Sequence, residues 1–457
     1  MPLRRLRVAA AAAAVAVSAA SAAPAQAAPA CGETITSDTT LSQSIADCPG
    51  DGVVIGADGV DLNLGGNTID GTGLGVGVRN QGHDNVTITN GTITQFDYGV
   101  VLRPGASENV VQGLTLRENQ NMALKLSDAD GNAIRGNELV GSKRDGLVLL
   151  NGSTANELEG NRVVGTGLDA VRIIDSPNND VESTTVATSG DEGLVFRRSR
   201  AAALTDSTIS GTADAGVEIA RSRSFTLTGN EIRQTSDAGV SLTASTGTTI
   251  AGNLLANTGD SGIALTSSTD NVVRRNTLSG AGDDGVTLLD STGNTILENT
   301  VNGASDSGVE LQSSSGNRVV RNQLRGNPSG VELQSSNANL IRWNDASLSG
   351  GFGISVESSG DNRVLSNTAN GNGASGIYVK GESATNPGHN ILEANTANDN
   401  KARGIYVESV RTRLTGNIAE RNASWGIWAV AGVIDGGGNH ANSNGEALQC
   451  FNLSCIP

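Results

Sequence analysis

Residues 271–288 read NVVRRNTLSGAGDDGVTL, and this stretch contains the unit from which the chain is built. It holds three short apolar segments, at Val272-Val273, around Leu278, and from Val286 to Leu288, separated by polar residues and glycine. None is long enough to show a helical period, and short apolar segments bounded by turn residues indicate β-strands. The stretch therefore predicts three short strands in each unit.

The Gly-apolar-x-apolar ending of this unit recurs along the chain. From Gly193 to Gly308 the anchor position returns every 23 residues, and only the step from Gly376 to Gly404 is long, at 28 residues. A repeat of about 23 residues made of short strands is typical of one turn of a parallel β-helix. We expect about 16 or 17 coils, each stacked ~4.8 Å from the last. The anchors are Gly77, Gly99, Ala123, Gly146, Ala170, Gly193, Gly216, Gly239, Gly262, Gly285, Gly308, Gly330, Gly353, Gly376, Gly404 and Gly426.

The composition agrees with a thin, repeating core. The chain has 457 residues and 60 glycines, but only 2% of its residues are aromatic, so it cannot build the several globular cores that its length would suggest. Collagen is excluded because there are 9 prolines and glycine has no three-residue period. A hydrophobic content of 37% is also high for a disordered chain.

Two columns of asparagine follow the repeat. Asparagine tolerates left-handed turn conformations, and stacked side-chain amides can bond from coil to coil, so we interpret both columns as structural. A leucine-rich repeat has a similar period and also places Asn after a strand. Against that alternative, Val and Ile share the core positions with Leu, and no helical segment closes the repeat. One column holds Asn90, Asn137, Asn161, Asn230, Asn253, Asn276, Asn299, Asn322, Asn344, Asn367, Asn395 and Asn417, and the other Asn85, Asn109, Asn132, Asn156, Asn179, Asn271, Asn294, Asn317, Asn339, Asn362 and Asn390.

The N-terminus has the pattern of a secretory signal. Three arginines within residues 4–7 precede an apolar run, and Ala25-Gln26-Ala27 is an A-x-A cleavage site. The run is too short to cross a membrane, so we expect a secreted, extracellular protein without a membrane span. The net charge of −16 repels phosphate backbones, and no nucleic-acid partner is expected.

The four cysteines lie near the two ends, Cys31 and Cys48 at one and Cys450 and Cys455 at the other. Four cysteines allow three pairings, but in a solenoid the ends are too far apart for a bond that needs Cα atoms within ~7 Å. We therefore predict the pairs Cys31–Cys48 and Cys450–Cys455, formed in an oxidising compartment. The expected organisation is a signal peptide at 1–27, an N-terminal cap and first coil at 28–71, parallel β-helix repeats at 72–435 and a C-terminal cap at 436–457.

The start of the mature chain resembles a known family. Cys31-Gly32, Cys48-Pro49 and residues 60–71, VDLNLGGNTIDG, look like the N-terminal cap and first coil of secreted bacterial right-handed parallel β-helix repeat proteins of the pectate-lyase-like superfamily. The later coils are similar to the repeats of that superfamily, so the resemblance implies this all-β fold over nearly all of 31–457. The superfamily includes lyases, hydrolases, epimerases and members without known activity, so it leaves the reaction and the catalytic residues unknown. One branch is named for periplasmic copper binding, but 3 His, 2 Met and paired cysteines do not support copper here.

The outward positions of the anchor strands suggest a binding face near the C-terminus. The residues two and four places after each anchor point out of the rod, and Tyr378, Tyr406 and Trp428 share one such column. Rings beside carboxylates and a lysine are what a sugar-binding groove requires, so we predict a polysaccharide partner. The alternative is that aromatic residues simply suit exposed strands at the end of the rod. The predicted substrate-binding residues are Glu357, Tyr378, Lys380, Tyr406, Glu408, Trp425 and Trp428.

Charged residues form further columns. Glu310 and Glu332 on adjacent coils are expected ~5 Å apart, the spacing of a retaining glycosidase pair, although any acidic column in a β-helix gives that distance. Aspartates also stand two residues before successive anchors, and we hypothesise Ca²⁺ between coils at Asp237, Asp260, Asp283 and Asp306, with solvated turn residues as the alternative. A basic cluster contains Arg197, Arg198, Arg200, Arg221 and Arg223. It either meets an anionic glycan or forms salt bridges with neighbouring acids.

Together these patterns predict a secreted, monomeric parallel β-helix that binds or processes extracellular polysaccharide and requires no cofactor other than, in the hypothesis above, calcium. The sequence leaves open whether it is an enzyme; an enzyme would be a polysaccharide lyase, hydrolase or epimerase. The coils lack the long loops with which active members wall a cleft, which argues against catalysis. The alternative is a non-enzymatic cell-surface or matrix scaffold that contacts proteins.

Overall fold

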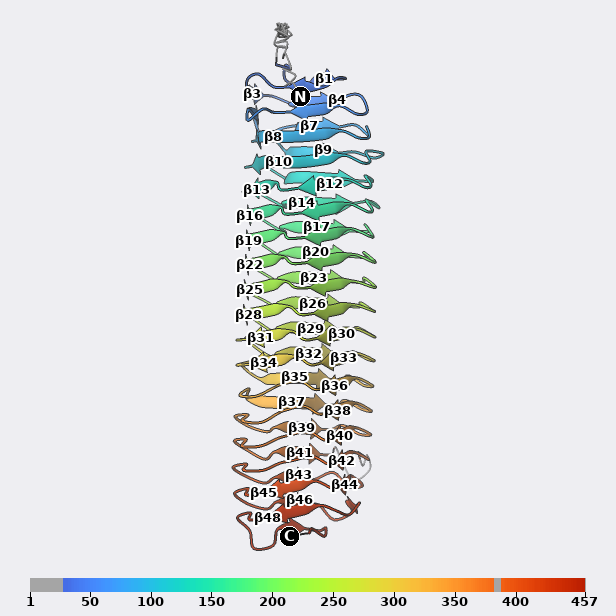
Figure 1. The fold of residues 1–457 in the computed structure, drawn as a ribbon, viewed down its shortest axis with the longest axis vertical. Helices are drawn as coiled ribbons and strands as arrows, with labels where there is room; N and C mark the ends of the chain where they lie inside the picture. The colour runs from blue at the N-terminus through green and yellow to red at the C-terminus, as the bar shows by residue number, and fades with distance from the viewer. Residues whose placement is uncertain (1–27, 382–387, 457) are drawn as a thin grey trace, which may run out of the picture.

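A computed structural model describes residues 28–381 and 388–456 and shows a long rod of stacked coils, with the two termini at opposite ends (Figure 1). The predicted signal peptide lies outside the described residues, as do residues 382–387 of the long repeat. The paired strands are parallel, and the described residues contain no helix, which confirms the predicted all-β parallel β-helix. No helix able to cross a membrane is therefore found in the described part of the chain.

The anchor strands stack into one continuous sheet, called sheet A here. It holds 19 strands, which corresponds to about 18 turns rather than the 16 or 17 expected. The difference arises because the predicted caps also contribute coils to this sheet. Gly32 and Gly52 align in register with the anchor Gly77, whereas Gln449 takes the anchor position in the C-terminal coil. Sheet A contains β1 (Glu33–Ile35), β4 (Val53–Ile55), β7 (Val76–Asn80), β9 (Tyr98–Leu102), β11 (Met122–Ser127), β14 (Leu147–Leu150), β17 (Val171–Ile174), β20 (Leu194–Arg197), β23 (Val217–Ala220), β26 (Val240–Thr243), β29 (Ile263–Thr266), β32 (Val286–Leu289), β35 (Ser307–Gln312), β37 (Ser329–Gln334), β39 (Ile354–Glu357), β41 (Ile377–Lys380), β43 (Ile405–Val407), β46 (Ile427–Ala429) and β49 (Cys450–Phe451).

The other two strands of each coil form two further stacks, called sheets B and C here. Sheet B contains β2 (Thr39–Thr40), β5 (Asp61–Asn63), β8 (Thr87–Thr94), β10 (Val110–Arg117), β12 (Ala133–Arg135), β15 (Glu157–Glu159), β18 (Asp180–Glu182), β21 (Ala203–Thr205), β24 (Thr226–Thr228), β27 (Thr249–Ala251), β30 (Val272–Arg274), β33 (Thr295–Leu297), β36 (Arg318–Val320), β38 (Leu340–Arg342), β40 (Arg363–Leu365), β42 (Ile391–Glu393), β44 (Arg413–Thr415) and β47 (Ile434–Asp435). Sheet C contains β3 (Ile45–Cys48), β6 (Thr68–Gly71), β13 (Glu138–Val140), β16 (Arg162–Thr166), β19 (Thr185–Ser189), β22 (Thr208–Thr212), β25 (Glu231–Thr235), β28 (Leu254–Thr258), β31 (Thr277–Ser279), β34 (Thr300–Asn302), β45 (Ile418–Glu420) and β48 (His440–Asn442). The long strands β8 and β10 pair into both stacks.

The core is filled from the alternating inward positions of these strands. In the unit at 271–288, the side chains of Val273, Leu278, Val286 and Leu288 are buried, whereas Thr287 between the last two faces outward. The interior is narrow at each anchor: a Cβ placed on Gly285 would lie 2.2 Å from Val301 Cγ1 and 2.6 Å from the carbonyl oxygen of the next anchor. The anchor is glycine because the neighbouring coils approach too closely for a side chain.

Buried asparagine amides bond from coil to coil, as predicted. From Asn230 to Asn439, each Asn donates from Nδ2 to the Oδ1 of the corresponding Asn in the next coil, at 2.9–3.1 Å. The same Oδ1 also accepts the backbone N–H of the preceding Asn, for example from Asn276 to Asn299 at 3.0 Å. The second Nδ2 hydrogen goes to a backbone carbonyl, so the amides in these buried turns have partners for their donors and acceptors.

Two details of the asparagine prediction are wrong. The left-handed residue is the one before the column Asn, such as Arg275 (φ 53°) before Asn276, because the Asn itself must turn its side chain into the interior. Asn85 and Asn90 are exposed and have left-handed φ values of 55° and 60°, so they do not belong to the buried ladders, the columns of hydrogen-bonded asparagine amides. In their coil the ladder positions are the next residues along the chain, beginning with Val86, whose backbone N–H bonds Asn109 Oδ1.

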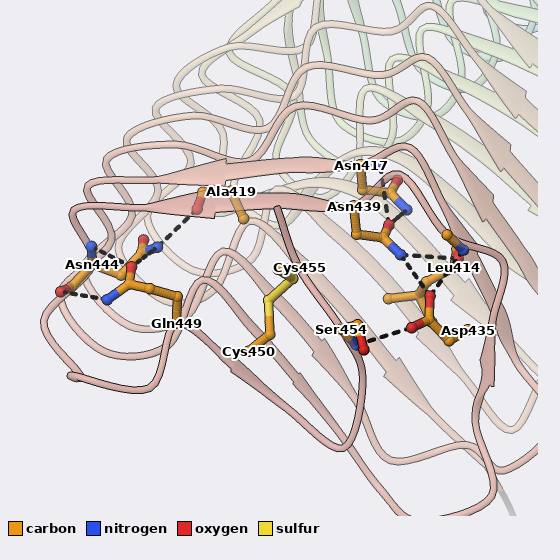
Figure 2. Close-up of a disulfide and its surroundings, with 11 residues drawn as sticks. Leu414, Asn417, Ala419, Asp435, Asn439, Asn444, Gln449, Cys450, Ser454 and Cys455 are labelled. Atoms are coloured by element: carbon orange, nitrogen blue, oxygen red, sulfur yellow. Dashed lines mark hydrogen bonds between the residues drawn. A yellow bond between two sulfur atoms is a disulfide. The ribbon is translucent and has the colours of Figure 1, made fainter. Parts of the chain in front are cut away.

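Both predicted disulfides are present, Cys31–Cys48 and Cys450–Cys455. Around the second, Figure 2 shows how the ladders end: Asn439 donates to the Leu414 carbonyl, and Gln449 supplies the oxygen that Asn444 would otherwise find in a further coil. The disulfide closes the turn directly after Gln449, next to these terminal amides. Two disulfides fit an extracellular or periplasmic location.

Replacing Asn299 with Ala should destabilise the rod. The change removes the shared acceptor of the Asn276 N–H and Nδ2, and leaving buried donors unpaired costs about 2–4 kcal/mol. The midpoint of chemical denaturation should fall accordingly. The matched control is Asn302→Ala, at an exposed position of β34, where a change within about 0.5 kcal/mol is expected. Equal midpoints for the two variants would contradict the structural role of the ladder.

Candidate functional site

The outward face of sheet A carries columns of side chains, and one column contains the residues two places after each anchor. Parallel pairing in register places each of these residues directly beside the one in the next coil, as Tyr378 is beside Tyr406 and Tyr406 beside Trp428. The predicted aromatic residues are therefore brought together. They lie on β41, β43 and β46, the last full coils of the rod (Figure 1).

The aromatic rings form a continuous stack along these coils. Phe352 stacks on Tyr378 with ring centroids 4.8 Å apart, and Tyr378 stacks on Tyr406 at 5.1 Å. Tyr406 meets Trp428 edge to face at 5.1 Å, and Trp428 lies parallel to Phe451 at 5.7 Å. Since the coil spacing of ~4.8 Å is close to the distance at which rings stack, the rings cover one another's faces.

This packing changes which rings are available to a ligand. Tyr378 is only 9% exposed because it lies between Phe352 and Tyr406, so it supports the stack rather than presenting a face. Phe451, in contrast, is 37% exposed on β49, the last strand of sheet A. Phe451 was missed by the sequence analysis because its coil has no glycine anchor, although its position 23 residues after Trp428 repeats the period.

Charged groups surround the aromatic stack. The Glu408 carboxylate accepts hydrogen bonds from the hydroxyls of Tyr378, at 2.8 Å, and Tyr406. Arg403 lies over the Tyr406 ring, with Cζ 4.0 Å from the centroid, and has no carboxylate partner among the described residues. Lys380 Nζ is 3.7 Å from Glu357. Of the predicted residues, Trp425 is the most peripheral, 6.4 Å from Phe451 between ring centroids.

A pocket that the sequence analysis did not anticipate lies at the other end of the same face. It has a volume of about 450 Å³ and is lined by Arg79, Tyr98, Arg103 and Lys125, among others. Arg79 pairs with Asp51, and Lys125 Nζ is 5.4 Å from the Tyr98 ring centroid. The sequence could have indicated this pocket, since Arg79 and Lys125 occupy the same outward column as the C-terminal aromatic residues.

Buried carboxyl groups form a row in the middle of this face. Glu310 and Glu332 are register partners, as expected, and Asp284 on the preceding coil bonds Thr287 Oγ1 at 2.9 Å and the Ser307 N–H at 2.7 Å. Burial, followed by the charge of Glu310, raises the pKa of Asp284 to about 8. Within this row Asp284 is 1% exposed, whereas Glu310 and Glu332 are only partly buried.

A second row of carboxyl groups lies beside β17 and β20. Burial, together with hydrogen bonds to Glu218 and Asp169, raises the pKa of Glu192 to about 9. Burial likewise raises the pKa of Asp169 to about 6. Arg197 pairs with Glu218 and lies 3.4 Å from Glu192. Glu192 therefore holds a proton at neutral pH, which reduces its repulsion with the neighbouring carboxylates.

The predicted calcium residues are only partly assembled. Asp283 and Asp306 join Asp284 in a group whose carboxylate oxygens lie within 4.8 Å of one another. Asp237 and Asp260 belong to no such group of three in the described chain; Asp237 instead bonds Asp214, and burial raises its pKa.

The three histidines are dispersed along the rod. His83 contacts Asp58, His389 lies near Asp361 and His440 near Glu420, each with a single carboxylate. The cysteines are in disulfides, and Met122 is buried in β11. Within residues 28–381 and 388–456, the groups of three or more metal-ligating side chains contain carboxylates alone.

The raised pKa of Glu192 predicts a pH effect on stability. Between about pH 5 and 8 the folded protein keeps a proton that the unfolded chain releases, so stability falls as pH rises, by at most about 1.4 kcal/mol per pH unit for each proton. In Glu192→Gln the thermal midpoint should decrease less with pH over this range than in the wild type, and the midpoint at pH 8 should be higher. Glu182→Gln, on the exposed side of β18, is the control. A Glu192→Gln midpoint with the wild-type pH dependence would show that this carboxyl holds no such proton.

Comparison with solved structures finds β-helix proteins at low identity. The chain resembles the catalytic domain of a GH87 alpha-1,3-glucanase (12% identity, TM-score 0.43), covering 56% of this chain and 60% of that one. It resembles the periplasmic alginate epimerase AlgG (16%, TM-score 0.38), with 78% of each chain covered. It also resembles the A-module of the Azotobacter vinelandii mannuronan C-5 epimerase AlgE4 (15%, TM-score 0.39), covering 69% of this chain and 86% of the module. No curated protein sequence matches the chain.

Two family models match the sequence. The right-handed beta helix region model matches residues 36–186. The model described as periplasmic copper-binding protein (NosD) matches residues 146–268, 178–349 and 305–445, which together span most of the rod. The chain therefore belongs to the NosD family of right-handed parallel β-helix proteins, within the pectate-lyase-like superfamily.

Proposed function

We propose that this protein binds an extracellular polysaccharide on the outward face of sheet A, at the C-terminal coils. The observation that carries the proposal is the stack of aromatic rings from five consecutive coils on that face, with charged side chains beside it. Sugar sites combine apolar ring surface with a few well-placed polar groups, and both are present here.

The contacts assign different tasks to the residues. Phe451, on the last strand of sheet A, supplies exposed ring surface at the end of the stack, and the half-buried Trp428 and Trp425 lie beside it. Arg403 and Lys380 supply donors for hydroxyl or carboxylate groups, and Glu408 and Glu357 supply acceptors. Tyr378 and Tyr406 hold Glu408 in place through their hydroxyls, which donate to Oε2 and Oε1 respectively.

Trp428→Ala and Tyr406→Ala should weaken binding to a glycan by about tenfold or more, because each removes a ring from the stack. The measurement is affinity gel electrophoresis against alginate, polygalacturonate, soluble cellulose and soluble chitin derivatives. Reducing-sugar release and absorbance of unsaturated uronides in the same mixtures report any processing of the glycan.

Two control variants locate the binding. Trp343→Ala removes a tryptophan that is 41% exposed on a different part of the coil, beside Arg321 and Arg342, and should leave binding unchanged. Tyr98→Ala tests the pocket at the N-terminal end of the same face. Failure of wild-type protein to be retarded by every glycan would reject the proposal, and loss with Tyr98→Ala alone would reject the C-terminal location.

Calcium is a second part of the proposal, and we assign it to the group of Asp283, Asp284 and Asp306. Asp283, Asp284 and Asp306 offer carboxylate oxygens within 4.8 Å of one another, and hard oxygen ligands suit Ca²⁺. Asp283 and Asp306 are exposed, so an ion can reach them. The ion would bridge adjacent coils and so stabilise the rod.

If calcium binds there, 5 mM CaCl₂ should raise the thermal midpoint relative to EDTA by about 2 °C or more. Asp306→Asn should abolish the shift, whereas Asp290→Asn, an exposed aspartate in the turn after β32, should retain it. Identical midpoints of the wild type in calcium and EDTA would remove calcium from the proposal.

The copper in the family's description does not fit this chain. Copper prefers imidazole, thiolate and thioether ligands. In the described residues each histidine faces one carboxylate on a separate coil, and the cysteines are paired in disulfides. No copper chemistry is therefore assigned to it.

A further inference from the structure

An arginine-lined pocket lies in the middle of the rod, at the turn that follows the sheet A strands β20 and β23. Its volume is about 380 Å³, and its lining includes Arg198, Arg200, Arg221 and Arg223. These residues come from two consecutive coils of a chain whose net charge is −16. The pocket is remote from the aromatic stack, which begins at Phe352 six coils further along.

The register of the coils arranges the four arginines as two stacked pairs, called the arginine array here. Arg200 pairs directly with Arg223 in a parallel bridge. Arg198 and Arg221 both have φ 51° and occupy the same left-handed turn position on their coils. Neighbouring coils are ~4.8 Å apart, so each pair brings like charges close together.

The backbone beneath the arginine array is held in place. Ser199 and Ser222 alternate with the arginines and point inward, where the Ser199 N–H donates to Ser222 Oγ at 3.2 Å and the Ser222 N–H donates to Ser245 Oγ at 3.1 Å. Both serines are nearly fully buried. The arginines therefore project from a rigid turn, and binding does not require the backbone to become ordered.

The charges of the arginine array are mostly unbalanced by the protein. Arg198 is paired with Asp175, through bonds of 2.6 Å from Nε and Nη2. Arg200, Arg221 and Arg223 have no carboxylate partner among the described residues, unlike Arg197 on β20, which pairs with Glu218 on the neighbouring strand β23. On the next coil the corresponding positions are Ala244 and Thr246, so no acid faces the arginine array from that side.

We propose that the arginine array binds a tetrahedral oxyanion, a phosphate or sulfate group. Guanidinium groups bind such anions through paired N–H donors, and the anion relieves the repulsion between the stacked charges. Arginines on both sides of one pocket offer donors from several directions, which matches three or four anionic oxygens better than the two of a carboxylate.

Two sources can supply this chemistry, the free ion and a phosphate or sulfate ester on an extracellular glycan. The site is independent of the proposed glycan face, since no residue is shared between them. Binding at the arginine array and binding at the aromatic stack therefore respond to different substitutions.

The test uses variants that copy neighbouring coils. Arg221→Ala with Arg223→Thr reproduces Ala244 and Thr246, residues that the same fold accepts at these positions. The control, Arg274→Ala with Arg318→Thr, removes the same charge from sheet B and copies the register partners Ala251 and Thr295. Thermal midpoints of the full mature chain confirm that both variants are folded. Titrations with sodium phosphate, sodium sulfate, dextran sulfate, neutral dextran and polygalacturonate are performed at constant ionic strength.

The wild type and the control should bind phosphate or sulfate, and the array variant should bind at least tenfold more weakly. Dextran sulfate binding tightly while the inorganic ions bind weakly would identify an ester group on a polymer as the source, and the reverse order would identify the free ion. Equal binding by the array variant and the wild type would overturn the proposal. So would tighter binding of polygalacturonate than of dextran sulfate, since that would assign the array to carboxylates.

Discussion

The amide-to-amide hydrogen bonds between successive asparagines set the conditions under which the rest of this rod forms. A coil of about 23 residues has little interior, so its turns bring backbone N–H groups and side-chain amides into positions that water does not reach. Each of these groups finds its partner at the same position of the next coil, as Asn276 does in Asn299. Strict register follows, because a coil shifted by one residue would leave several buried donors unpaired.

The same register governs the surface. Any side chain that points outward is repeated at ~4.8 Å, so like side chains form columns whose properties depend on their chemistry. Aromatic residues stack and support one another, as from Phe352 to Phe451. Carboxyl groups must share protons or pair with arginine, as Glu192 and Glu218 do around Arg197. Arg200 and Arg223, which have no carboxylate partner among the described residues, are the positions where we propose that an anion binds from solution.

Much of the fold could be predicted from sequence because the repeat is itself the structural unit. The Gly anchors, the alternation of apolar residues and the asparagine columns report local sterics and hydrogen bonding, which do not depend on distant parts of the chain. The errors arose at the ends of the rod and in one coil: the terminal coils were assigned to caps, although only the C-terminal one has Gln449 in place of glycine, and Asn85 and Asn90 were placed one residue out of register. The columns of the candidate site were also predictable, since register follows from the period.

The parallel β-helix, its two disulfide pairs and the residues that share each outward column followed from the sequence, because all of these depend on spacing along the chain. Which members of a column remain available followed only from the packed coils. Tyr378 is covered by its neighbours whereas Phe451 is exposed, and Asp284 lies below the surface whereas Asp283 and Asp306 reach solvent. Likewise, Arg198 is paired with an aspartate, whereas Arg223 has no carboxylate partner in the described part of the chain. The physical reason is that exposure and ion pairing depend on side chains from adjacent coils and on the end of the rod, which no single repeat contains.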